Sequence, residues 1–306
     1  MRLVFAGTPA VAVPALNELA RGTHELAAVI TREDATLGRK RVLTPSPVAS
    51  AAQERHLATI KANRLDASVT ERVADLRPDL GVIVAYGGLV REPLLSLPRL
   101  GWINLHFSLL PRWRGAAPVQ RAVIAGDAVT GASVFQLVPE LDAGAVFAEA
   151  TRAIGADETA GDVLDALAGI GARLLAETVD AIADGTAHSS PQTGEMTLAP
   201  KLTLDDARIH LAGDAGSAFD RIRGVTPEPG AFVMLADQRL KILEAKPASG
   251  EPSLPAGRAA FRDKRVLVGT STHPLELVTV QPAGKRPMSA ADWWRGLADT
   301  EEVVLS

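Results

Sequence analysis

The segment from Trp102 to Pro118, which reads WINLHFSLLPRWRGAAP, holds residues that could do chemistry. An apolar run within it carries two polar side chains, those of Asn104 and His106. Alternate side chains of a β-strand share a face, so both groups point the same way if the run is a strand. A buried amide and a buried imidazole cost free energy unless each finds a hydrogen-bond partner. The pair therefore predicts a place where a small reactive group is held.

A third candidate, Asp142, lies in the turn LDAG between two further predicted strands. A carboxylate can fix the tautomer of an imidazole and stabilise its cation, and the imidazole can exchange a proton. An amide N–H can stabilise a carbonyl oxygen that gains negative charge. Asn104, His106 and Asp142 together suit acyl transfer to an external nucleophile, in which a tetrahedral intermediate forms and an incoming amine loses a proton. The chain has no cysteine and no G-x-S-x-G motif, so other nucleophilic mechanisms are not indicated.

Alternating strand and helix signals over the first two hundred residues must position these groups. Apolar runs separated by helical patterns predict a parallel sheet that is covered on both faces. The expected strands are residues 2–6, 26–30, 80–85, 101–106, 132–138 and 145–150, and the expected helices are residues 48–57, 68–76 and 159–183. Ligands of such sheets bind outside the carboxyl ends of the strands. All three candidate side chains fall at predicted strand ends.

Two further segments divide the chain. A loop of seventeen residues is expected from Thr31 to Pro47, and loops of this length are often functional. The polar, aperiodic stretch from His188 to Thr203 indicates a linker. Beyond it, short strand-like runs (231–235, 240–245, 265–269 and 275–281) are punctuated by Pro and Gly, which is typical of a small β-barrel or sandwich. We therefore expect domains over residues 1–187 and 206–306, with a linker over 188–205.

Composition limits the class of protein. The chain has 306 residues, of which 47% are apolar and 22% charged, as in ordinary globular proteins. Its net charge of −4 excludes binding of a polyanion by bulk electrostatics, so contacts with nucleic acid must come from local clusters. No apolar run is long enough to span a bilayer, and the start lacks the features of a signal peptide. We therefore expect a cytoplasmic protein with no membrane partner.

The segment NLHFSLLPRWRGAAPVQ, with LDAG at residues 141–144, resembles the methionyl-tRNA formyltransferase family, whose folate-dependent signature has the form N-x-H-x-S-L-L-P. The likeness includes FAGTP at the start, IVAYGG after a predicted strand, TPSPV at the end of the long loop and QPAGKRPMSAADW near the C-terminus. It therefore spans nearly the whole chain. It implies an α/β fold, namely a Rossmann-like, mostly parallel sheet of the formyltransferase type, followed by a small OB-like β-barrel.

The resemblance also implies an activity, the transfer of a formyl group from the co-substrate 10-formyltetrahydrofolate to the α-amino group of methionine on initiator methionyl-tRNA. Asn104, His106 and Asp142 would be the catalytic residues, and neither a metal nor a stable oligomer is expected. The residues that would bind folate are Tyr86, Gly87, Ser108, Leu109, Leu110 and Pro111. Which group accepts the proton of the amine stays open at this point.

Basic and aromatic residues indicate where tRNA would bind. Arg112 and Arg114 flank Trp113, and charge with stacking would grip the acceptor end of a tRNA, although a core tryptophan between solvated arginines fits the same residues. In the family a basic loop at the position of residues 31–47 reaches the acceptor stem, which makes Arg39 the first candidate. The expected tRNA contacts are Arg39, Lys40, Arg41, Arg112, Arg114, Lys201 and Lys285.

Three other functions compete with this one. A folate formyltransferase that acts on a sugar-nucleotide amine or on glycinamide ribonucleotide shares the same chemistry, but the basic loop and the C-terminal domain argue against it. A dinucleotide-binding oxidoreductase is disfavoured because GTPAVA lacks the other glycines of G-x-G-x-x-G. A non-catalytic RNA-binding protein would have lost its catalytic residues, whereas suitable residues occupy all three positions here.

Overall fold

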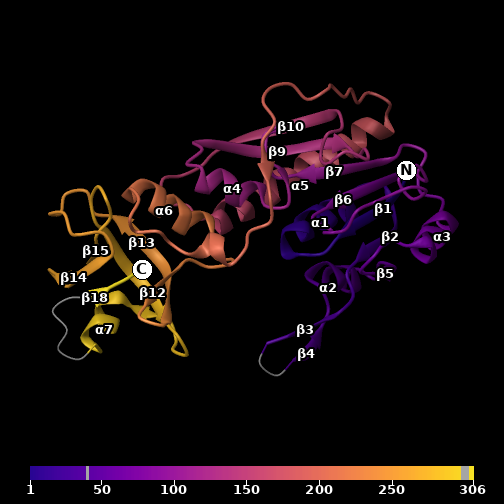
Figure 1. Ribbon diagram of the computed structural model, residues 1–306. Helices are drawn as coiled ribbons and strands as arrows, with labels where there is room; N and C mark the ends of the chain where they lie inside the picture. Colours follow the sequence, from indigo (N-terminus) through magenta and orange to yellow (C-terminus); the bar gives the residue numbers. More distant parts are fainter. Residues whose placement is uncertain (39–40, 298–302) are drawn as a thin grey trace. The chain divides into compact units, whose positions relative to one another are not determined.

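A computed structural model describes residues 1–38, 41–297 and 303–306 (Figure 1). The chain divides into two compact units that are interleaved in sequence. The first unit holds residues 1–116, 130–152 and 164–199, and the second holds residues 117–129, 153–163 and 200–306. Among the helices that are described, none is long and apolar enough to cross a membrane.

Seven strands form the main sheet of the first unit, in the order β10-β9-β7-β6-β1-β2-β5. Their bounds are Arg2–Gly7 (β1), Glu25–Thr31 (β2), Thr59–Lys61 (β5), Leu80–Val84 (β6), Trp102–His106 (β7), Val129–Gln136 (β9) and Val146–Ala153 (β10). Strands β1, β2, β5, β6 and β7 are parallel, and β9 is antiparallel to β7. The predicted Rossmann-like, mostly parallel sheet is confirmed. Strand β5 has no counterpart in the prediction because three residues are too few to show a hydrophobic period.

Local sequence explains where the helices of this unit begin. Their bounds are Ala10–Ala12 (η1, a 3-10 turn), Val13–Arg21 (α1), Pro47–Glu54 (α2) and Ala67–Asp75 (α3). Helix α2 follows Ser46, whose hydroxyl accepts a hydrogen bond from the first turn, and Pro47 occupies a helix-starting position that needs no N–H. Asp66 caps α3 in the same way. These caps fix the helix starts within a residue or two of the predicted ones.

Helix α5 (Ala160–Ala183) determines which face of β7 is open to a ligand. Gly171 packs so closely on β7 that a Cβ there would lie 3.0 Å from the side chain of Leu105. Because side chains alternate along a strand, Asn104 and His106 point to the other face. The sheet therefore presents both candidate side chains on the face that α5 does not cover.

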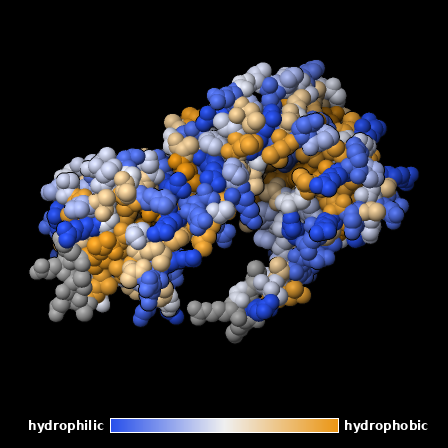
Figure 2. All heavy atoms as spheres, in the orientation of Figure 1, coloured by the Kyte–Doolittle hydropathy of each residue, from blue (hydrophilic) through white to orange (hydrophobic). Residues whose placement is uncertain are grey.

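The segment from Thr31 to Pro47 differs from the predicted loop. It forms an antiparallel hairpin of strands β3 (Ala35–Leu37) and β4 (Val42–Thr44). Strands of three residues leave no alternating pattern in the sequence, which explains the error. The hairpin exposes apolar side chains, since Val42 is 57% and Leu43 is 65% exposed, and Figure 2 shows hydrophobic residues on its surface.

An antiparallel sheet forms the second unit, in the order β12-β13-β16-β15-β14-β18, with β17 paired to β16. Its strands are Phe232–Leu235 (β12), Gln238–Pro247 (β13), Arg258–Arg262 (β14), Arg265–Val268 (β15), Leu275–Pro282 (β16), Met288–Ser289 (β17) and Val303–Val304 (β18). After β18 the chain pairs back to β12, because Met234 N–H donates to Ser306 O at 2.6 Å and Ser306 N–H to Met234 O at 2.9 Å. The two edges of the sheet therefore meet, as in the expected barrel.

Helices from distant parts of the sequence complete this unit. They are α4 (Pro118–Ile124), η2 (Asp205–Ala207), α6 (Ala215–Gly224) and α7 (Ala290–Arg295). Helix α4 packs on α6 at Gly224, where a Cβ would lie 2.4 Å from the Ile124 side chain. Arg121 of α4 also forms an ion pair with Asp206 at 2.9 Å. These contacts explain why a segment that precedes β9 in sequence belongs to the second unit.

Candidate functional site

Strand β7 ends at the centre of the candidate site. His106 is 6% exposed, and its ring meets the ring of Phe135 on β9 edge-on, with 6.4 Å between the ring centroids. Asn104 is partly exposed on the same face. Within the described part of the chain, the side-chain amide of Asn104 makes no hydrogen bond. An amide of this kind can donate to a ligand without first giving up an internal partner.

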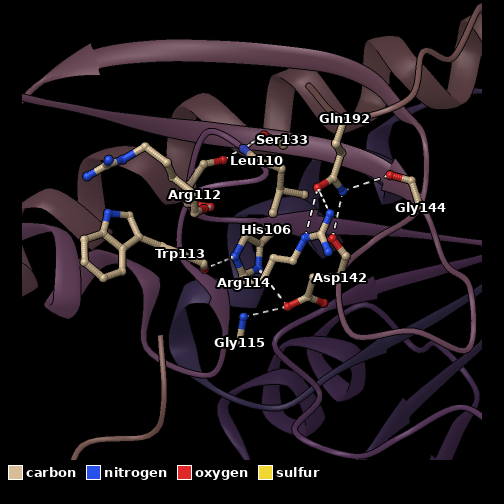
Figure 3. Close-up of polar contacts among 11 residues, drawn as sticks. His106, Leu110, Arg112, Trp113, Arg114, Gly115, Ser133, Asp142, Gly144 and Gln192 are labelled. Atoms are coloured by element: carbon tan, nitrogen blue, oxygen red, sulfur yellow. Dashed lines mark hydrogen bonds and ion pairs between the residues drawn. The ribbon is translucent and has the colours of Figure 1, made fainter. Parts of the chain in front are cut away.

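The loop after β7 brings a backbone carbonyl to His106. The Ser108 hydroxyl donates to Arg112 O at 2.6 Å, and Trp113 N–H donates to the hydroxyl of Thr197 at 2.9 Å. Trp113 has a φ of 61°, in the left-handed region that a bulky side chain seldom adopts. This arrangement sets Trp113 O 2.8 Å from Nε2 of His106 (Figure 3).

Asp142 approaches His106 from the turn between β9 and β10. One carboxylate oxygen, Oδ2, accepts a hydrogen bond from Gly115 N–H at 2.8 Å and lies 3.9 Å from Nδ1 of His106 (Figure 3). A separation of 3.9 Å is too long for a direct hydrogen bond but short enough for a strong effect of charge. The structure thus brings two of the three predicted side chains together, and the third lies two residues away on the same strand.

These contacts define the proton state of His106. A carbonyl oxygen only accepts, so Nε2 carries the hydrogen that binds Trp113 O. In the neutral ring the lone pair is therefore on Nδ1, which faces Asp142. Burial of the imidazole lowers the pKa of His106 below its ordinary value, while the charge of Asp142 and the hydrogen bond to Trp113 O act in the opposite direction. The ring is therefore neutral at pH 7 and has a free site for a proton beside a carboxylate.

Gln192 belongs to the site although its segment of the sequence predicts a linker. Its side-chain amide donates to Asp142 O at 2.7 Å and to Gly144 O at 2.9 Å (Figure 3). Its oxygen accepts from Nε and Nη2 of Arg114 at 3.0 and 2.5 Å. Gln192 lies in the polar stretch HSSPQTGEMTLAPKLT, residues 188–203. A single glutamine in such a stretch does not indicate a contact of this kind.

The turn after β6 holds two of the residues expected to bind folate. The Tyr86 side chain is buried and its hydroxyl donates to Ala62 O at 2.7 Å, so this side chain serves the fold. Gly87 has a φ of 79°, and its carbonyl accepts a hydrogen bond from Arg32. The backbone of this turn lies at the end of the strand beside β7, where a flat amide-like ligand edge can pair with main-chain groups.

The other expected folate residues form the SLLP loop. Ser108, Leu110 and Pro111 are buried, and Leu109 is partly so. Leu110 N–H donates to the Ser133 hydroxyl at 3.2 Å, and Leu110 lines a pocket of about 340 Å³ with residues 146–149 and 190–193. Among residues 1–38, 41–297 and 303–306, no group of three or more His, Cys, Asp or Glu side chains is placed to hold a metal ion.

The expected tRNA contacts lie in different settings. Arg39 and Lys40 fall outside the described residues. Arg41 is exposed at the start of β4, and Arg112 is exposed with its guanidinium carbon 5.4 Å from the Trp113 ring centroid. Arg114 is directed inward to Gln192, unlike a free surface cation. Lys201 and Lys285 are exposed in the second unit.

Two protein families match this chain, one over its first part and one over its second part. The family described as Formyl transferase matches residues 1–179, and the family described as Formyl transferase, C-terminal domain, matches residues 201–298. The methionyl-tRNA formyltransferase of Leifsonia xyli subsp. xyli is 65% identical over 306 residues, which is 100% of both chains. That of Thermobifida fusca is 49% identical over 298 residues, covering 97% of this chain and 96% of the relative.

Solved structures agree on the fold. A sugar 3N-formyl transferase determined in the presence of dTDP and 5-N-formyl-THF has a TM-score of 0.70 at 13% identity, covering 94% of this chain and 99% of its own. HypX from Aquifex aeolicus in complex with tetrahydrofolic acid has a TM-score of 0.64 at 17% identity, covering 96% of this chain and 46% of its own. These two likenesses show the fold alone, whereas the matched families and the full-length relatives show that this chain belongs to the methionyl-tRNA formyltransferases.

Proposed function

We propose that this protein transfers the formyl group of 10-formyltetrahydrofolate to the α-amino group of methionine on initiator methionyl-tRNA. One observation carries the proposal: the buried His106 binds Trp113 O through Nε2 and presents Nδ1 to a carboxylate oxygen 3.9 Å away. Asn104 lies two residues before His106 on the same strand, and its side-chain amide has no hydrogen-bond partner among the described residues. The full-length relatives that are named methionyl-tRNA formyltransferases support this choice of substrates.

The folate co-substrate fits the residues at the strand ends. The main chain of Tyr86 and Gly87 and the SLLP loop, residues 108–111, would hold it, and the unpartnered amide of Asn104 is suited to its formyl oxygen. When bound, 10-formyltetrahydrofolate supplies the formyl group. Asn104 then donates to the formyl oxygen and stabilises the negative charge that develops there.

His106 accepts the proton of the amine, and Asp142 stabilises the cation that results. Nδ1 of His106 is the free site, so it takes the proton that the attacking amine loses, either directly or through a water between the two side chains. The carboxylate of Asp142 then stabilises the imidazolium. Because burial disfavours the cation, the imidazolium would give this proton to N10 of the departing tetrahydrofolate, as the bond between N10 and the formyl carbon breaks.

We further propose that tRNA binds to basic side chains of both domains. Arg41 and Arg112 are exposed near the hairpin and the SLLP loop respectively. We assign the second domain to residues 206–306, where Lys285 is exposed, and a linker to residues 188–205, where Lys201 is exposed. Arg39 and Lys40 are proposed from the family resemblance alone. Stacking of Arg112 on Trp113 leaves a flat, charged surface that suits an unpaired nucleotide.

The proposed function is tested by incubating purified protein with 10-formyltetrahydrofolate and methionyl-tRNA, and by separating formylated from free methionyl-tRNA on an acid gel. We expect formylation of the charged initiator tRNA. Glycinamide ribonucleotide and an amino-sugar nucleotide serve as competing acceptors in parallel reactions. Formylation of either of these, with none of methionyl-tRNA, would contradict the proposal.

Reversing the charge of Arg41 or Arg112 should weaken tRNA binding. For Arg41→Glu and Arg112→Glu we expect the KM for methionyl-tRNA to rise about tenfold at low salt with kcat nearly unchanged, since phosphate contacts position the substrate. Steady-state kinetics at two salt concentrations measures this effect. Arg72→Glu, an equal change of charge at an exposed site on α3, is the matched control. Equal KM values for the control and for both variants would exclude these arginines from the interface.

A further inference from the structure

The turn that carries Asp142 does not hold its shape through its own contacts alone. Asp142 has a φ of 46°, a left-handed conformation that costs free energy for a residue with a Cβ. Gly144 lies so close to β9 that a Cβ there would be 1.7 Å from Gln136 O. The turn is thus confined in space and contains a left-handed residue, and contacts from other segments hold it in this conformation.

Gln192 supplies those contacts with its whole side-chain amide. Both of its N–H donors are used on the turn, at Asp142 O and Gly144 O, and its oxygen accepts the two N–H groups of Arg114. Arg114 in turn precedes Gly115, whose N–H binds the carboxylate of Asp142 at 2.8 Å. Hydrogen bonds from Gln192 to the Asp142 main chain and from Arg114 to Gln192, the backbone from Arg114 to Gly115, and the hydrogen bond from Gly115 N–H to the Asp142 carboxylate therefore form a closed ring (Figure 3).

We propose that Gln192 and Arg114 are positioning residues for formyl transfer, which together hold the Asp142 carboxylate at its distance from Nδ1 of His106. This inference rests on the proposed role of Asp142 in the reaction. It assigns a task in the active site to residue 192, whose segment the sequence marks as a linker.

The chemistry of the ring explains why an amide is needed at position 192. A glutamate there would still accept from Arg114, but it would face the carbonyl oxygens of Asp142 and Gly144 with oxygens of its own. It would also add a second negative charge near His106. An amide satisfies two acceptors and one guanidinium at once without changing the charge around the imidazole.

Gln192→Leu breaks the hydrogen bonds that link Gln192 to Arg114 and to the Asp142 turn, while Asn104, His106 and Asp142 themselves are unchanged. We expect kcat to fall roughly 10- to 100-fold, because a misplacement of about 1 Å is enough for such a loss, with both KM values within about twofold. Gln192→Glu keeps the contact with Arg114 and should lose as much as the leucine variant. Arg114→Lys replaces the two hydrogen bonds to Gln192 with one at most, and its kcat should fall less than that of Gln192→Leu. Gln53→Leu, at an exposed glutamine on α2, is the matched control, and thermal unfolding checks that each variant folds.

A double-mutant cycle with Asp142→Asn decides whether Gln192 acts through Asp142. If it does, Gln192→Leu lowers kcat by less than about twofold in the Asp142→Asn background. The full loss in that background, or a rise in KM at constant kcat, would overturn the proposal, as would a Gln192→Glu variant with wild-type kcat. If Asp142→Asn itself has wild-type kcat, the proposed role of Asp142 fails, and that result is distinct from a failure of the ring alone.

Discussion

Replacing His106 with alanine is expected to lower kcat for formyl transfer by about 10³-fold, within the range that a general base contributes. The variant loses the free Nδ1 beside Asp142 and leaves no other neutral base in contact with that carboxylate among the described residues. The KM values for folate and tRNA should change little, because the imidazole acts on the proton of the amine more than on the bound ground state. Rapid-quench kinetics at saturating substrates measures the loss.

The control for this variant is His188→Ala, since His188 is an exposed histidine of the same unit. It should keep wild-type kcat. Near-wild-type formyl transfer by His106→Ala at saturating folate would show that the assigned chemistry is wrong. A thermal unfolding curve separates a chemical defect from a folding defect, because the lost ring also packs on Phe135.

Replacing Asn104 with alanine is expected to lower kcat by about 10²- to 10³-fold, as does the loss of one donor to a developing oxyanion elsewhere. The distinguishing expectation concerns stability. The Asn104 amide has no hydrogen-bond partner in the described residues, so its removal breaks no internal hydrogen bond and the melting temperature should stay within about 2 °C.

Asn63→Ala is the matched control, because Asn63 is exposed in the same unit and lies outside β7. Its side-chain amide donates a hydrogen bond to the Glu33 carboxylate at 2.8 Å. This control should keep both kcat and thermal stability. If Asn104→Ala instead keeps kcat within about threefold of wild type, the amide has no part in the reaction. A large loss of stability would assign the amide a structural role.

Much of the site could be predicted because its signals are local in sequence. Asn104 and His106 share a strand, and the period of two places them on one face without further information. The capping residues Ser46 and Asp66 likewise mark helix starts within a few residues. The nearness of Asp142 to His106 was expected from the rule for carboxyl ends of parallel strands, and that reason is wrong. Strand β9 is antiparallel to β7 and ends beside the start of β7, so the turn after β9 must run back along the sheet to bring Asp142 to His106.

What could not be predicted depends on contacts between distant segments. Gln192 meets Asp142 across fifty positions of sequence, and a glutamine in a polar stretch is usually solvated. The packing of α4 on α6 through Gly224 joins segments about a hundred residues apart. Strands β3, β4 and β5 have three residues each, too few for a hydrophobic period. The roles of the individual folate and tRNA residues stay predictions.

The central claim is that neutral His106 accepts the proton of the amine beside a charged Asp142. The pH dependence of kcat in the wild type and in Asp142→Asn tests it most directly. Activity falls as pH drops through the pKa of His106, and the charge of Asp142 raises that pKa against the effect of burial. Without this charge the acid limb of kcat should therefore move to lower pH in the variant, while titration of the substrate amine affects both proteins equally. An acid limb that stays in place, or that moves to higher pH, would contradict this mechanism.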